Sequence, residues 1–134
     1  MKRIVKTVVI VGATIVVFSS LALSAQAAST FGAVAISAQS GVVGRATGAP
    51  SQAEAERLAL DQCAKLGGTD CRVATWTRGN YCGAVAVKTF ANGGLTWASS
   101  TAPTLPEAKT QAMQRCEKEA KSPCDDVVAD VCSN

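Results

Sequence analysis

The chain has 134 residues, the length of one small domain. Three of its 13 basic residues, Lys2, Arg3 and Lys6, lie at the N-terminus, so the rest of the chain has 10 basic and 10 acidic residues and no net charge. A neutral chain has no electrostatic footprint for a nucleic acid or an anionic membrane surface, so we expect neither as a partner.

The N-terminal segment has the order of a secretory signal. An uncharged stretch from Thr7 to Ala28 follows the basic residues, and Ala25-Gln26-Ala27 places small residues at both positions that signal peptidase reads. This pattern predicts a cleavable signal peptide over residues 1–27 and a secreted domain over residues 28–134, periplasmic or extracellular and free of the membrane after cleavage. The alternative is an uncleaved membrane anchor, because the uncharged stretch is long enough to span a bilayer.

The secreted part contains an internal repeat. Gly32-Ala33-Val34-Ala35 recurs as Gly83-Ala84-Val85-Ala86. Further along, the segment that begins at Pro50 recurs from Pro103, and the same offset relates Cys63 to Cys116 and Cys71 to Cys124. Matches at cysteines favour a duplication over chance, with copies at about residues 31–77 and 82–132.

Each copy predicts the order strand, strand, helix, strand. Apolar stretches bounded by glycine turns or cysteines predict strands over residues 31–37, 42–47, 72–77, 82–90, 95–99 and 126–132. The capping boxes Ser51-x-x-Glu54 and Thr104-x-x-Glu107 predict where the helices begin. Gly67-Gly68 ends the first helix. The fold class is therefore α+β, with two β-β-α-β repeats in one small disulfide-stapled domain.

Six cysteines behind a predicted signal peptide indicate a disulfide framework. Equivalent cysteines of the two copies should form equivalent bonds, which predicts the pairs Cys63–Cys71 and Cys116–Cys124 and leaves Cys82–Cys132. Metal binding is the alternative use of these cysteines. The chain has no histidine and no C-x-x-C motif, so we expect no metal site.

Several motifs together resemble a known family. They are Gly-Ala-Val-Ala after an aromatic residue, a helix with Glu-Ala and a terminal cysteine, and the segments Asp70–Val73, Tyr81–Ala86 and Val131–Ser133. In these features the chain resembles a bacterial secreted family, domain of unknown function 4189, over about residues 31–133. The resemblance implies export and the architecture above, and it brings no established catalytic residues.

Candidate catalytic groups are few. Without histidine the chain cannot form a Ser-His-Asp or Cys-His arrangement. Carboxylate pairs remain, at Asp125-Asp126 and Glu117/Glu119. Neighbouring residues on a strand point to opposite faces, so we expect solvated surface charges there rather than a catalytic pair. No glycine-rich phosphate motif is present, and we expect no cofactor.

The segment that joins the two copies is the best candidate for a binding site. Trp76, Arg78 and Tyr81 lie within six residues and are of the types enriched in binding hot spots. The alternative is that Trp76 belongs to the core and that the residues after it form a plain turn. We therefore expect a non-enzymatic secreted domain that binds a secreted, envelope or host protein or an envelope component. The alternatives are a passive envelope protein without a dedicated site and a carboxylate-dependent hydrolase.

Overall fold

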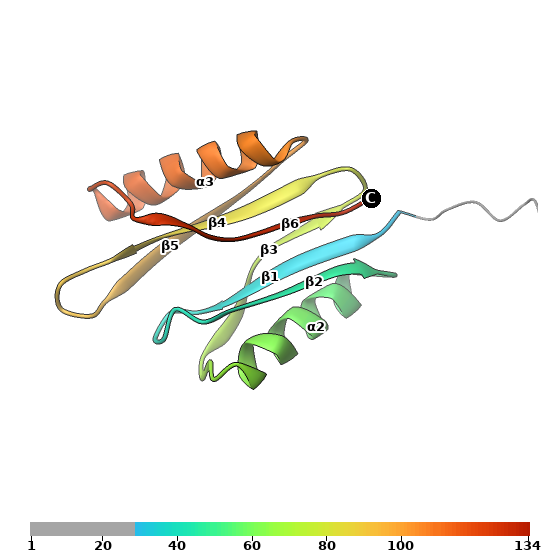
Figure 1. The fold of residues 1–134 in the computed structure, drawn as a ribbon, viewed down its shortest axis with the longest axis horizontal. Coiled ribbons are helices and arrows are strands. Elements are labelled where there is room, and N and C mark those ends of the chain that lie inside the picture. Colours follow the sequence, from blue (N-terminus) through green and yellow to red (C-terminus); the bar gives the residue numbers. More distant parts are fainter. Residues whose placement is uncertain (1–28) are drawn as a thin grey trace, which may run out of the picture.

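The computed structural model describes residues 29–134, and the predicted signal peptide over residues 1–27 lies outside the described residues. Figure 1 shows two sheets lying between two helices. The elements in chain order are β1 (Phe31–Ser37), β2 (Val43–Ala49), α2 (Gln52–Lys65), β3 (Cys71–Arg78), β4 (Cys82–Thr89), β5 (Leu95–Ala102), α3 (Leu105–Ala120) and β6 (Asp126–Cys132). This order confirms the α+β class and agrees with the pattern of two β-β-α-β units.

The strand bounds differ from the expectation mainly where pairing continues beyond the apolar residues. β2 extends to Ala49 because that residue pairs with Phe31, and β5 extends to Ala102 because it pairs with Cys82. Polar residues of β5 such as Ser100 belong to the ladder as well. Backbone hydrogen bonding, not side-chain polarity, therefore sets the ends of these strands.

Each unit forms its own three-stranded antiparallel sheet, and the first strand of the unit lies in the centre. The strand orders are β2-β1-β3 and β5-β4-β6. The register between β1 and β3 shifts at Val34/Ala35, and the register between β4 and β6 shifts at Val85/Ala86, the equivalent position. The two sheets thus share this irregularity, whereas the register shift between β1 and β2 at Phe31/Ala33 has no counterpart between β4 and β5.

The central strands are buried on both faces. On β1, Ala33 and Ala35 pack against α2, and on β4, Ala84 and Ala86 pack against α3. Small residues let each helix lie close to its sheet. The alternate residues of both strands, Val34, Ile36, Val85 and Val87, form a third cluster together with Ala129 and Val131 of β6. This valine-rich cluster joins the two sheets face to face, so the layers run helix, sheet, sheet, helix.

The helix caps agree in part with the expectation. Ser51 Oγ accepts a hydrogen bond from the backbone N–H of Glu54 at 3.2 Å, and Thr104 Oγ1 accepts one from Glu107 N–H at 3.4 Å. The reciprocal half of each capping box does not form. Glu54 pairs with Arg57 at 2.7 Å, and Glu107 accepts the hydroxyl proton of Thr104, so neither carboxylate reaches the N–H of its cap residue.

Three disulfides are present, and they join the pairs expected from the repeat: Cys63–Cys71, Cys116–Cys124 and Cys82–Cys132. The first two connect a helix to the strand or segment that follows it. The third joins β4 to β6 at directly paired positions. Every disulfide lies within one unit, so the chain between β3 and β4 is the one covalent link between the two units in the described residues. In the part of the chain that the structure describes, neither helix is sufficiently long and apolar for a membrane span.

Candidate binding site at the junction of the two units

The connection between β3 and β4 is a tight turn at Gly79 and Asn80. Both residues have positive φ, at 38° and 39°. Glycine and asparagine are the residues that adopt this left-handed conformation most readily. Two such residues in succession reverse the chain within the short connection between Arg78, where β3 ends, and Cys82, where β4 begins. The turn therefore brings Arg78 and Tyr81, which flank it, onto one end of the molecule.

Segments from both ends of the domain hold this turn in place. Gly79 N–H donates to the carbonyl of Thr30 at 3.1 Å, and Ser133 N–H donates to the carbonyl of Tyr81 at 3.0 Å. Thr30 N–H in turn donates to the carbonyl of Asn134 at 2.8 Å. These backbone hydrogen bonds fix the turn before any ligand arrives, which lowers the entropy lost on binding.

A surface hollow of about 470 Å³ lies beside the turn, lined by Trp76, Thr77, Arg78, Tyr81 and Thr101. It includes all three residues that the sequence singled out. Thr101 was missed, because it comes from β5 of the other unit and reaches the hollow only through the stacking of the two sheets. We call this place, where β3 lies beside β5, the β3–β5 seam.

The two aromatic side chains at this seam are partly open to solvent. Trp76 is 40% exposed and Tyr81 is 48% exposed. The interpretation of Trp76 as a core residue is therefore wrong in part. Its ring lies 6.4 Å from that of Phe31, tilted by 31°, so one side of Trp76 is packed and the other is accessible.

The position of α2 explains why Trp76 is accessible. Trp76 pairs with Ala33 across β1–β3, so both side chains are on the helix-facing side of the first sheet. However, α2 packs mainly over β1 and β2 and only partly over β3. The outer face of the third strand is thus left open near its end.

Arg78 is an exposed cation with no partner in the part of the chain that the structure describes. None of the ion pairs within residues 29–134 involves it. No acidic residue lines the hollow beside it. The guanidinium is therefore free to bind an incoming acceptor.

The second seam, between β2 and β6, occupies the equivalent place in the other half of the fold. Asp130 pairs with Ala84 across β4–β6, as Trp76 pairs with Ala33 across β1–β3. A hollow of about 430 Å³ is found here too, lined by Arg45, Ala46, Thr47, Asp130, Val131 and Cys132. The hollows thus follow from the architecture, and the two seams differ in the side chains placed there.

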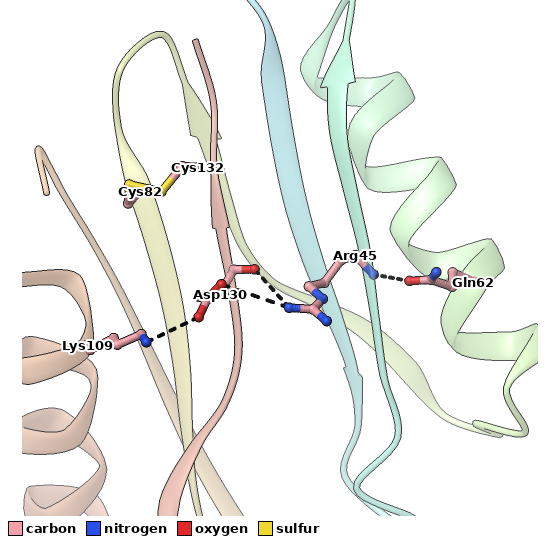
Figure 2. A network of polar contacts seen from close by, with 6 residues as sticks. All are labelled: Arg45, Gln62, Cys82, Lys109, Asp130 and Cys132. Carbon is pink, nitrogen blue, oxygen red and sulfur yellow. Dashed lines mark hydrogen bonds and ion pairs between the residues drawn. A yellow bond between two sulfur atoms is a disulfide. The ribbon is translucent and has the colours of Figure 1, made fainter. Parts of the chain in front are cut away.

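At the β2–β6 seam these side chains bind one another. Figure 2 shows the carboxylate of Asp130 between Arg45 of β2 and Lys109 of α3. Arg45 Nη1 lies 3.9 Å from Asp130 Oδ1 and 3.5 Å from the carbonyl oxygen of Asp130, and Lys109 Nζ lies 3.5 Å from Oδ2. The side chain of Gln62 accepts the backbone N–H of Arg45. The charged groups of this seam are therefore paired with one another within the protein.

The candidate catalytic carboxylates have structural contacts or lie on the outer surface. Asp125 accepts the backbone N–H of Thr89 at 2.7 Å, and this hydrogen bond is the main cause that lowers the pKa of Asp125. Asp126 accepts the N–H of Val127 at 2.7 Å. Glu117 and Glu119 are exposed on α3. Residues 29–134 contain no cluster of three or more histidine, cysteine or acidic residues arranged to hold a metal ion.

The fold and the junction therefore define a small α+β domain of two disulfide-bonded units with one polar seam and one aromatic seam. The family described as "Domain of unknown function (DUF4189)" matches residues 31–132. The chain belongs to this family. No curated protein and no solved structure matches this chain.

Proposed function

We propose that this chain is a secreted binding domain without an enzymatic activity of its own, and that it binds a protein or an envelope component at the β3–β5 seam. The observation that carries the proposal is the difference between the two equivalent seams. At one seam the charged side chains are paired with one another through Asp130, whereas the other presents Trp76, Tyr81 and an unpaired Arg78 to solvent in the described residues.

The chemistry of the open seam suits binding. Aromatic side chains bring a large contact area with few rotatable bonds, and arginine adds directional hydrogen bonds. Because no internal carboxylate competes for Arg78 in the described residues, a partner need not break an ion pair to reach it. The anchored turn adds little ordering cost.

Secretion is supported by the signal-like order of residues 1–27 and by the three disulfides, which form and persist in oxidising compartments. The absence of enzymatic activity is supported by the lack of histidine in the chain. The lowered pKa of Asp125 argues against a general-acid role for this carboxyl, because a general acid needs a raised pKa.

The experiment is a comparison of baits. The exported protein and two variants are used to capture partners from secreted and envelope fractions, and the captured material is quantified by mass spectrometry. Arg78→Ala/Tyr81→Ala should lose the specific partner, whereas Arg45→Ala, at the other seam, should retain it. Trp76 is left unchanged because its packing against Phe31 supports the fold. Equal capture by all three baits would contradict the proposal.

A further inference from the structure

We infer that the ligand recognised at the β3–β5 seam is an acidic saccharide, that is, a pyranose ring that carries a carboxylate. This inference rests on the proposed binding function and assigns the chemical class of its ligand. It follows from the charge of the hollow, from its aromatic surfaces and from the state of the neighbouring strand edges.

The charge of the hollow selects an anion. Among its five lining residues, Arg78 is the only charged one. The guanidinium is planar and presents paired N–H donors that match a carboxylate in a two-bond geometry. A neutral ligand would leave the N–H donors of Arg78 hydrogen-bonded to water. A ligand with one carboxylate would accept hydrogen bonds from them instead.

The rest of the hollow suits a sugar ring. The accessible aromatic surfaces of Trp76 and Tyr81 can pack against the C–H face of a pyranose, which is apolar, while the hydroxyls of Tyr81 and Thr101 can exchange hydrogen bonds with its hydroxyl groups. A volume of about 470 Å³ lies within the range of small-ligand sites, roughly 300–1,000 Å³. It is therefore large enough for one or two sugar rings.

The strand edges at this seam disfavour an extended peptide. A peptide that adds to a sheet needs free backbone groups on an edge strand. At the β3–β5 seam, the carbonyl of Ala74 already accepts the hydroxyl proton of Ser99 at 2.7 Å. The carbonyl of Ser99 accepts a hydrogen bond from Arg115 Nη1 at 3.1 Å. These two carbonyls are therefore not available to an added strand, so we expect side chains to carry the recognition, as they do for a saccharide.

The test uses digalacturonic acid and its dimethyl ester, which share ring stereochemistry and linkage and differ in charge. Each is titrated into the exported protein and followed by backbone amide chemical shifts. We expect the acid to bind at least about tenfold more tightly than the ester, with shifts at residues 76–81 and 101. Arg78→Ala should abolish this preference for the acid, and Arg45→Ala should preserve it.

Two results would overturn the inference. One is that the acid does not bind at millimolar concentration, and the other is that the Arg78→Ala variant binds the acid as tightly as the unmodified protein does. The bait comparison separates this failure from failure of the proposed function. If a protein partner is captured in an Arg78- and Tyr81-dependent manner while the acid does not bind, the saccharide assignment is wrong and the binding function remains. If neither binds, both are wrong.

Discussion

Trp76 and Asp130 occupy equivalent positions in the two halves of this fold. Trp76 on β3 pairs with Ala33 on β1, and Asp130 on β6 pairs with Ala84, the equivalent residue on β4. Each lies on the helix-facing side of a third strand that its helix covers only partly. At one position a carboxylate ties β6 to β2 and α3, and at the other an indole ring remains accessible. Equivalent positions thus hold an ion-paired side chain at one seam and an accessible aromatic side chain at the other.

The ion pairs of Asp130 should contribute modestly to stability. Asp130→Ala should lower the free energy of unfolding by up to about 1 kcal/mol, because its side chain is 35% exposed and partly exposed ion pairs are weak. Urea unfolding measures the effect. In a double-mutant cycle, Arg45→Ala and Asp130→Ala should cost less together than the sum of the single changes. Strict additivity would show that the two side chains do not interact.

The disulfides should differ in their contribution according to loop length. Cys63–Cys71 and Cys116–Cys124 each close a loop of 8 residues, and Cys82–Cys132 spans 50. On the loop-entropy estimate, paired replacement by alanine should cost about 2.5 kcal/mol for either short loop and about 4 kcal/mol for the long one. Thermal melts of the three double variants give the order. A larger loss for a short loop would contradict this account.

The two units should remain associated when the chain between them is cut. A protease site inserted between Gly79 and Asn80 allows cleavage of the folded protein. No disulfide crosses this point, so only noncovalent contacts can hold the halves together: the packing of the valine-rich cluster and the hydrogen bonds between the units, such as that of Thr30 with Asn134. We expect the cleaved protein to elute as one species on size-exclusion chromatography under non-reducing conditions. Separation into two folded fragments would show that the sheets do not share a core.

Acid should destabilise the protein through Asp70 and Asp125. Hydrogen bonds from the Ser37 hydroxyl to Asp70 and from Thr89 N–H to Asp125 lower the pKa of each carboxyl below 3.8 in the folded state. Between the lowered and the unfolded pKa, the unfolded chain binds more protons. The stability that each group contributes is therefore complete above about pH 5 and is lost as the pH falls through the folded-state pKa.

The measurement is the urea midpoint between pH 7 and pH 2. Asp70→Asn and Asp125→Asn should each lower the midpoint at pH 7 and flatten its fall below pH 4, because asparagine does not titrate. Asp126→Asn is the control, because Asp126 is exposed and its carboxylate accepts the N–H of the adjacent residue Val127. An acid limb identical to that of the unmodified protein in both variants would contradict the role given to these hydrogen bonds.

The repeat predicted most of the fold because it carries local information. Capping residues, turn glycines and strand alternation are read within a few positions, and the offset between Cys63 and Cys116 constrained the disulfide pairs. The stacking of the sheets was not predictable in this way. Contacts such as Ser99 with Ala74 and Arg45 with Asp130 join residues far apart in sequence, and no local pattern marks them.

The candidate site, like the fold, was predictable only where the information is local in the sequence. Trp76, Arg78 and Tyr81 stood out by residue type and lie around one hollow, but their role in binding stays a prediction. Thr101 could not be found, because only the packing of β5 beside β3 places it there. The accessibility of Trp76 depends on where α2 lies over the sheet, and the sequence of the strand does not report this.

The most direct measurement is a titration of the captured partner into the protein and its Arg78→Ala/Tyr81→Ala variant, with thermal melts showing that both are folded. We predict that the variant binds more weakly by at least about 1–2 kcal/mol, the loss typical of hot-spot residues. Arg45→Ala should bind as the unmodified protein does. Unchanged affinity in a folded Arg78→Ala/Tyr81→Ala variant would contradict the assignment of the β3–β5 seam as the binding site.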